Sequence, residues 1–249
     1  LPEQLGETVR TFRNLDCFGF NLTMPDKTAM LEYLDELSPA ARMIGAVNTV
    51  VNDHGKLTGY NTDGFGFMES LRRAGVHAAG QEMTLLGAGG AGSAIAVQAA
   101  LDGVKKLHIA NRKSRSFRHA EMLAQVITEN TVCRADVVDL EDAHAIGEAI
   151  DASGILANAT SVGMKKPDLP ADAENQLPLP DTGCLHEDLV VADVIYNPRQ
   201  TRLLREAQAR GCQTLNGMYM LLYQGAEAFR LWTGQDMPVS EVRQKYFAV

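Results

Sequence analysis

The sequence predicts an α/β fold built around a Rossmann-type, doubly wound parallel sheet, joined to a smaller split α/β substrate domain. From Met83 onward, apolar runs alternate with helical patterns at about 25 to 30 residues per unit, the rhythm of βαβ construction. A glycine-rich loop from Gly87 to Gly92 follows the first of these runs. The chain has 249 residues, 45% of them hydrophobic, which is enough for a large core and an interdomain cleft.

Composition excludes several classes of protein. The net charge of −8 argues against a general nucleic-acid binder, and no apolar run approaches the roughly 18 to 20 residues of a membrane span. The four cysteines include no CxxC pair, which favours reduced structural thiols and a cytoplasmic location. The six histidines show neither HxxxH nor HExxH spacing, so we expect no metal site.

The first third of the chain predicts a compact α/β unit. The run 17–22 is typical of a buried strand, and Pro25 is expected to open a helix that carries Met30, Leu34 and Leu37 on one face. No helix or strand start is evident before Leu5. Further elements are a helix capped by Ser38 with Pro39 at its first position, a hairpin with its turn at 53–55, and a helix that Asp63 caps and Gly75 ends.

The second part of the chain predicts the strands and helices of the parallel sheet. Between two of the strands, residues 165–183 hold four prolines and form a loop too long for a plain connector. A final helical pattern from Met218 to Gly234 is expected to leave the dinucleotide domain. The predicted strands lie at 83–86, 106–110, 133–140, 154–160, 189–196 and around Thr214, and the helices at 90–101, 117–127, after 140 and at 202–210.

The glycine loop is the strongest local signal. Gly87, Gly89 and Gly92 satisfy GxGxxG directly after a strand and at the start of a helix. Such glycines let the backbone approach a pyrophosphate, and the helix N-terminus offers free N–H groups to it. The alternative is a tight turn without a ligand. We predict a nicotinamide dinucleotide site here.

The end of the second strand indicates which dinucleotide is bound. An acid at this position would hydrogen-bond to the ribose of NAD, but the sequence reads Asn111-Arg112-Lys113-Ser114-Arg115. Three cations and no acid favour the 2′-phosphate of NADP, with NAD as the other candidate. The alternative is a solvated charge run at the start of a helix.

Lys27 and Asp63 are the candidate catalytic residues. Each follows a predicted strand and begins a predicted helix, the position at which α/β sheets gather ligand groups. An ammonium held by a carboxylate can give a proton to a carbonyl as hydride arrives. From spacing alone, a surface lysine and a helix-capping aspartate are the better interpretation.

With these motifs assembled, the chain resembles the shikimate dehydrogenase family and looks most like its quinate/shikimate dehydrogenase branch. The resemblance covers nearly the whole chain. It rests, in the family's order, on NLTMPDK, GAVNT, GYNTDG, LGAGGAG, NR, NATSVGM, VIYNP and MLLYQGAEAF.

The resemblance implies roles for individual residues and reverses the interpretation of Lys27 and Asp63, which become the catalytic pair. Substrate contacts are expected from Thr23, Asn48, Tyr196 and Gln224, although these residues have structural alternatives: a helix cap, a turn, a core aromatic and a solvated amide, in that order. The residues expected to border the cofactor are Gly87, Ala88, Gly89, Gly90, Gly92, Asn111, Arg112, Lys113, Arg115, Thr160, Met164 and Gly217.

Two departures from the family pattern give further expectations. The family's opening segment, with its pair of substrate-binding serines, has no counterpart here, so we expect the N-terminal segment of the substrate domain to be missing. Tyr219 stands where the family usually has a second glycine, and a bulky side chain there is expected to crowd or shift the nicotinamide.

The resemblance implies reversible reduction of 3-dehydroshikimate to shikimate, with quinate as a candidate second substrate. We expect a substrate domain of residues 1–66 and 217–249 around a dinucleotide domain of residues 67–216, in a monomer or homodimer without nucleic-acid or membrane partners. The alternatives are a non-catalytic nicotinamide-nucleotide sensor and a dehydrogenase of an aminated shikimate analogue.

Overall fold

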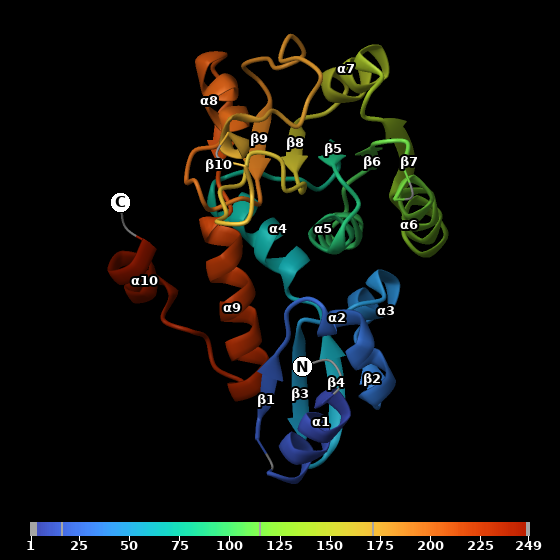
Figure 1. Cartoon of the computed structure of the whole chain (residues 1–249), viewed down its shortest axis with the longest axis vertical. Helices are drawn as coiled ribbons and strands as arrows, with labels where there is room; N and C mark the ends of the chain where they lie inside the picture. The colour runs from blue at the N-terminus through green and yellow to red at the C-terminus, as the bar shows by residue number, and fades with distance from the viewer. Residues whose placement is uncertain (1–3, 16, 115, 171, 248–249) are drawn as a thin grey trace.

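The computed structural model describes residues 4–15, 17–114, 116–170 and 172–247 and divides them between two α/β lobes (Figure 1). The upper lobe in this view is built on a six-stranded sheet and the lower lobe on a four-stranded sheet. Within the described residues, none of the helices has the length and apolar character needed to span a bilayer.

The six-stranded sheet is wholly parallel, with the order β10-β9-β8-β5-β6-β7. Numbered within the lobe, this is the 3-2-1-4-5-6 order of a Rossmann sheet, and its switch point lies between β5 and β8. The predicted doubly wound fold is therefore confirmed. The strands are β5 (Glu82–Leu86), β6 (Lys106–Asn111), β7 (Arg134–Asp139), β8 (Ile155–Asn158), β9 (Val190–Asp193) and β10 (Gln213–Leu215).

Both faces of this sheet are covered by helices. Successive strand residues enter different cores: Leu85 packs in one apolar cluster and Leu86 in the other, as the alternation of side chains in a strand requires. The first cluster includes α4 (Asp63–Arg73), α5 (Gly90–Leu101) and α6 (Phe117–Asn130), and the second includes α7 (Ala143–Asp151) and α8 (Arg202–Ala209). The long loop before β9 contains one short 3-10 turn, η3 (Ala173–Asn175).

The four-stranded sheet has the order β1-β3-β4-β2, and its central pair is the predicted hairpin. Ser38 caps α3 as predicted, because its Oγ accepts a hydrogen bond from the Ala41 N–H at 3.2 Å. The apolar core of this lobe includes Met30, Val47 and Leu57. Its elements are α1 (Leu5–Asn14), β1 (Gly19–Asn21), α2 (Asp26–Ala29), η2 (Met30–Tyr33), β2 (Glu36–Leu37), α3 (Pro39–Ile44), β3 (Thr49–Asp53) and β4 (Lys56–Tyr60).

One local expectation for this lobe is wrong. The helix predicted to run to Leu37 ends at Tyr33, because Leu34 is extended and the Asp35 N–H donates to the Leu57 carbonyl at 2.9 Å. Pairing with β4 thus overrides the helical period. The structure also contains the helix α1, which was not predicted from the sequence.

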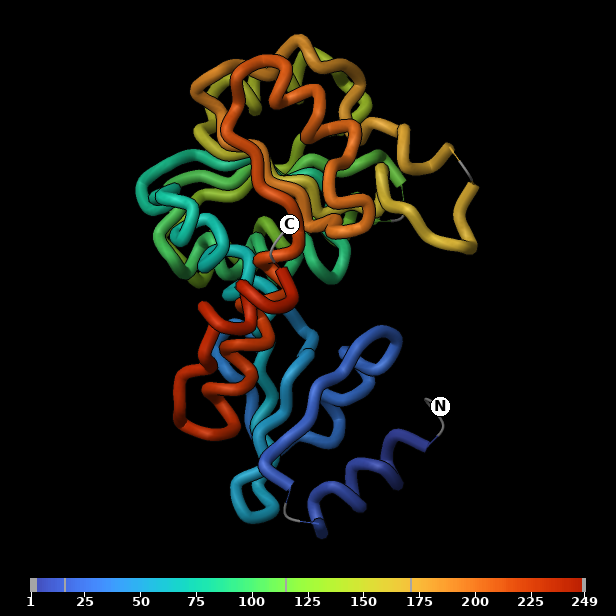
Figure 2. The backbone as a smooth tube through the Cα atoms, turned by 90° about the vertical axis from the view of Figure 1, so that its left-hand side faces the viewer, coloured from blue at the N-terminus to red at the C-terminus, as the bar shows by residue number. Residues whose placement is uncertain are grey.

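Helices α4 and α9 (Met218–Thr233) lie side by side and connect the lobes. The approach requires Gly66, since a Cβ there would lie 2.6 Å from backbone atoms of α9. At the far end of α9, Trp232 Nε1 donates to the Val50 carbonyl at 2.9 Å, so the helix reaches the lobe of the four-stranded sheet. Turned by 90°, the chain shows the C-terminal segment, with α10 (Val239–Val242) and the π-helical turn η4 (Arg243–Phe247), beside α9 (Figure 2).

Candidate active site

A cavity of about 390 Å³ lies between the two lobes. It is lined from below by the end of β1, α2 and the start of α4, and from above by α5, the segment after β9 and the first two turns of α9. The structure thus brings together residues that are far apart in sequence and that the resemblance singled out: Thr23, Lys27, Asn48, Asp63, Tyr196, Gly217 and Gln224.

Lys27 and Asp63 form a direct pair in this cavity. Lys27 Nζ donates to Asp63 Oδ2 at 2.6 Å, and the two side chains are only 22% and 16% exposed. Lys27 is therefore not a solvated surface lysine. Nor does Asp63 cap α4 with its side chain, because that helix begins with Thr62 at its N-cap and the carboxylate is directed to Lys27 instead. Burial strengthens such a charge-assisted bond and fixes its direction.

Asn48 orients the second oxygen of Asp63. Its Nδ2 donates to Asp63 Oδ1 at 2.9 Å and to Thr62 Oγ1 at 3.0 Å, while its Oδ1 accepts from the Thr62 N–H at 2.8 Å. Asn48 is 3% exposed, so these protein contacts occupy most of its amide. Thr49 adds a hydroxyl bond to Asn48 Oδ1 at 2.9 Å. Thr62 lies in the GYNTDG motif, but its hydrogen bonds to Asn48 could not be predicted from the sequence.

The structural alternatives for Thr23 and Tyr196 do not hold. Thr23 makes no side-chain cap at the start of α2, and Tyr196 is 49% exposed rather than part of the core. Gln224 contributes its amide to the cavity wall, and Thr62 Oγ1 donates to its Oε1 at 3.5 Å. All three residues line the cavity that holds the Lys27–Asp63 pair.

The glycine loop fits the backbone of a dinucleotide. Gly87 has a φ of +91°, and a Cβ at Gly92 would lie 2.1 Å from the Gly87 carbonyl oxygen, so both positions need glycine to close the turn. Gly89 and Gly90 are exposed and face open space at the N-terminus of α5. Ala88 is 1% exposed and belongs to the first apolar cluster. This arrangement leaves first-turn N–H groups accessible to a pyrophosphate.

The glycine loop and the Lys27–Asp63 pair share the same cavity. Ala91, in the first turn of α5, lines it together with Gly217 and Met220 from the start of α9. Tyr219 does not crowd this space: its ring stacks on Tyr223 at 6.4 Å and lies 4.9 Å below the Arg243 guanidinium, in a different cavity. The Tyr219 side chain therefore lines a cavity other than the one that holds Lys27.

The buried carboxylate of Asp193 accepts hydrogen bonds from three segments at the carboxyl edge of the six-stranded sheet. Asp193, at the end of β9, accepts hydrogen bonds from Asn158 Nδ2 at 3.1 Å, the Ile195 N–H at 3.0 Å and Thr201 Oγ1 at 2.8 Å. Asn158 Oδ1 in turn accepts from the Thr160 hydroxyl at 2.7 Å. Burial raises the pKa of Asp193 to about 6 against the lowering effect of these three bonds.

This network supports the predicted cofactor residue Thr160, whose Cγ2 lies 2.8 Å from where a Gly87 Cβ would stand. Met164 follows in the same loop and is half-buried. Asn158 begins the NATSVGM motif and Asp193 ends an apolar run, and the sequence offered no role for either residue because each lies in an apolar strand. Their signal was a polar residue at the carboxyl end of a buried parallel strand.

At the end of β6, the run Asn111 to Arg115 contains no acid, but the structure places Asp139 of the neighbouring strand β7 beside it. Asn111 is buried and donates to Ser116 Oγ at 3.0 Å, while Arg112 is exposed. Lys113 Nζ lies 3.0 Å from Asp139 Oδ2 at the end of β7. Of the three predicted cations, Arg115 lies outside the described residues, and one of the other two is paired.

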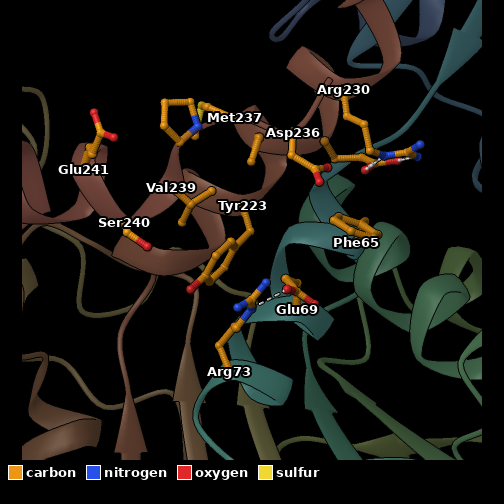
Figure 3. A pocket seen from close by; sticks show the side chains of 13 residues that line it. Phe65, Glu69, Arg73, Tyr223, Arg230, Asp236, Met237, Val239, Ser240 and Glu241 are labelled. Carbon is orange, nitrogen blue, oxygen red and sulfur yellow. Dashed lines mark hydrogen bonds and ion pairs between the residues drawn. The ribbon is translucent and has the colours of Figure 1, made fainter. Parts of the chain in front are cut away.

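A larger cavity of about 510 Å³ lies on another side of α4 and α9, against segment 236–241 (Figure 3). Its two guanidinium groups are neutralised: Arg73 pairs with Glu69 at 2.7 Å and Arg230 with Glu227 at 2.6 Å. It contains neither Lys27 nor the glycine loop, so it is not part of the candidate active site.

Two family models match the N-terminal and C-terminal segments of the chain. The shikimate dehydrogenase substrate binding domain matches residues 1–50, and the shikimate 5′-dehydrogenase C-terminal domain matches residues 217–245. These segments supply Lys27 and Asn48 on one side of the cavity and Gly217 and Gln224 on the other.

Relatives with known names match nearly the whole chain. A shikimate dehydrogenase (NADP(+)) of Listeria monocytogenes serotype 4b (strain F2365) is 48% identical over 245 residues, 98% of this chain and 82% of the relative. A quinate/shikimate dehydrogenase of Escherichia coli O139:H28 (strain E24377A / ETEC) is 46% identical over 226 residues, 91% of this chain and 76% of the relative.

The shared sequence corresponds to a shared structure. The crystal structure of a Listeria monocytogenes shikimate 5-dehydrogenase in complex with shikimate and NAD has a TM-score of 0.93 and 47% identity, over 97% of this chain and 82% of that one. Fold, cavity and whole-length identity agree, and the chain belongs to the shikimate dehydrogenase family.

Proposed function

We propose that this protein catalyses the reversible NAD(P)-dependent reduction of 3-dehydroshikimate to shikimate, and that quinate is a candidate second substrate. The observation that carries the proposal is the partly buried Lys27–Asp63 pair in a cavity that also reaches the dinucleotide loop through Ala91. The names of the relatives and the ligands of the solved structure support the substrate class.

Lys27 is the proposed proton donor and acceptor. A bound nicotinamide dinucleotide would supply or accept the hydride. As the carbonyl carbon gains hydride, its oxygen becomes basic, and the Lys27 ammonium donates a proton to it; in the reverse direction the Lys27 amine takes that proton back. Asp63 holds Nζ in place through the 2.6 Å bond, and Asn48 fixes the carboxylate. The half-buried setting limits competing water.

Substrate recognition is assigned to the polar groups on the cavity wall. We propose that Thr23, Tyr196 and Gln224 contact the hydroxyls or carboxylate of the substrate, because each presents a hydroxyl or amide to the cavity that holds Lys27. For Asn48 the geometry favours orientation of Asp63, since its amide is largely occupied by Thr62 and Asp63. Shape and hydroxyl placement then select a ring polyol over a flexible one.

For the cofactor, the proposal assigns the pyrophosphate to the backbone of the glycine loop and the adenosine end to the residues after β6. Gly87 and Gly92 shape the loop, and Gly89 and Gly90 offer it to the ligand. The remaining proposed cofactor residues are Ala88, Asn111, Arg112, Lys113, Arg115, Thr160, Met164 and Gly217.

The test is direct oxidation of shikimate. The purified protein is mixed with shikimate and either NAD or NADP, and the reduced nicotinamide absorbance is followed. The proposal predicts turnover with shikimate and none with an enantiomeric or ring-opened polyol. Dinucleotide binding without turnover of shikimate or quinate would instead indicate a nucleotide sensor.

We further propose a substrate domain of residues 1–66 and 217–249 and a dinucleotide domain of residues 67–216. The first boundary falls within α4, which therefore belongs to the junction. We also propose that the protein is a monomer or homodimer. The free state of all four cysteines supports a cytoplasmic location.

A further inference from the structure

The adenosine end of the proposed cofactor site holds a carboxylate that the linear motif does not contain. Asn111 ends β6, and its direct register partner on the neighbouring strand is Asp139, which ends β7. The Leu140 N–H donates to the Asn111 carbonyl at 3.1 Å and fixes the two strand ends side by side. Adjacent strands lie about 4.8 Å apart, so Asp139 is next to the position that reads the ribose in Rossmann folds.

The Asp139 side chain is held in place by two donors. Its Oδ1 accepts from the Glu141 N–H at 3.1 Å, and its Oδ2 lies 3.0 Å from Lys113 Nζ. The backbone bond from Glu141, followed by the Lys113 contact, lowers the pKa of Asp139, so the carboxylate stays charged at neutral pH. The carboxylate is only 19% exposed, whereas Lys113 is 69% exposed.

The charge balance of this strand end is therefore less positive than the sequence Arg112-Lys113 indicates. Lys113 is compensated by Asp139, and among the described residues of this loop Arg112 is the cation without an ion pair. A second phosphate on the ribose would approach a site whose described residues contain one uncompensated cation and a fixed carboxylate. A free 2′-hydroxyl would meet no such repulsion and would find an acceptor.

We infer that Asp139 is a cofactor-specificity residue: it opposes a ribose 2′-phosphate and favours a free 2′-hydroxyl, and so lets NAD compete with NADP in this protein. The inference rests on the proposed function only in placing a dinucleotide at the carboxyl edge of the sheet. Arg112 and Asp139 then act in opposite directions on the same ribose substituent.

The test compares two nucleotides that lack the nicotinamide, 2′,5′-ADP and 5′-AMP, by calorimetry on the intact protein. Asp139→Asn should raise the affinity for 2′,5′-ADP relative to 5′-AMP by about tenfold, the effect of one charge-assisted contact. Asp139→Ser is the second variant, since its hydroxyl can still accept the Glu141 N–H. Both variants should shift the ratio in the same direction.

The matched control is Asp142→Asn. Asp142 is another carboxylate three residues away, and it caps α7 by accepting from the His144 and Ala145 N–H groups at 3.1 Å. Asparagine caps equally well, so this change removes one negative charge without disturbing the helix. The nucleotide ratio should change by less than about twofold in this control, as expected for a screened, non-contacting charge.

An unchanged ratio in both Asp139 variants, a ratio that falls, or an equal shift in Asp142→Asn would overturn the inference. Failure of the parent protein to bind either nucleotide would overturn it together with the dinucleotide site. Absence of shikimate turnover in a protein that shows the predicted nucleotide ratios would overturn the proposed function alone.

Discussion

Lys27 Nζ lies 2.6 Å from Asp63 Oδ2, although the two residues are 36 positions apart and begin different helices. The contact exists because the backbone brings the strand ends together: the Val47 N–H donates to the Lys27 carbonyl, and the Asn48 N–H to the Tyr60 carbonyl, at 2.9 and 3.0 Å. The order of strands in the four-stranded sheet thus brings the motifs of Lys27 and Asp63 into one site.

Asn48→Ala should lower kcat by about a hundredfold, because Asp63 loses its orienting donor and no longer holds Lys27 in a productive direction. It should also cost about 1 to 3 kcal/mol of the free energy of unfolding by leaving the Thr62 N–H without its acceptor. Kinetics with shikimate and urea unfolding measure the two effects.

The control is Asn52→Ala, on strand β3, which begins directly after Asn48. Asn52 is also buried and bonded, to the Phe12 carbonyl and the Gly55 N–H, but it lies away from the cavity. It should lose stability and keep kcat. Equal kcat losses in both variants would mean that Asn48 acts only through folding.

Gly89→Ala should weaken binding of either dinucleotide by about tenfold or more, because a methyl group there occupies the space that a pyrophosphate approaches. The fold should tolerate the change, since Gly89 has a φ of −75° and its Cβ would meet no protein atom within 4 Å. Gly147→Ala in α7, which also meets nothing within 4 Å, is the matched control for binding measured by calorimetry. Undiminished affinity in Gly89→Ala would remove the loop from the binding site.

NADP should be used at least as well as NAD, and Arg112→Ala should lower kcat/KM for NADP by about tenfold or more, since a guanidinium can pair with a phosphate through two bonds. The value for NAD should change less. Arg134→Ala, at the exposed opposite end of β7, is the control and should leave the ratio of the two values as it is. A strong NAD preference in the parent, or an equal loss with both cofactors, would contradict this assignment.

Asp193 should make stability depend on pH. Its folded pKa of about 6 exceeds the ordinary value, so the folded state binds the extra proton between about pH 4 and 6. The stabilisation is complete below about pH 4 and is lost as the pH rises through 6, a change of about 3 kcal/mol. Asp193→Asn should remove this slope. Urea unfolding of both proteins from pH 4 to 7 tests it, and parallel curves would show that Asp193 does not titrate in this range.

Much of the fold was predictable because it depends on local signals. The glycine loop, the repeating strands and the Gly75 and Gly234 helix ends each have a sequence signature, and the structure shows positive φ at Gly75, Gly87 and Gly234. The helix predicted up to Leu37 failed for the opposite reason, because β2 is stabilised by pairing with β4, a partner 22 residues away.

The site was predictable as a set of residues but not as an arrangement. Motif resemblance identified Lys27, Asp63 and Asn48, but only the structure shows that Asn48 contacts Asp63. Asp139 was missed because its relation to Lys113 crosses between strands, and charge runs in sequence do not report such pairs. The direction of the Tyr219 side chain could not be predicted, because it depends on contacts with Tyr223 and Arg243.

The central claim is that Lys27 transfers the proton in shikimate oxidation, and turnover of Lys27→Ala tests it most directly. The control is Lys56→Ala, which removes a lysine paired with Glu36 on the exposed part of β4, away from the cavity. The account predicts that kcat with shikimate falls by about 10² to 10⁴ in Lys27→Ala while dinucleotide affinity hardly changes, and that Lys56→Ala retains the parent rate. Retention of more than about a tenth of the parent turnover in Lys27→Ala would contradict it.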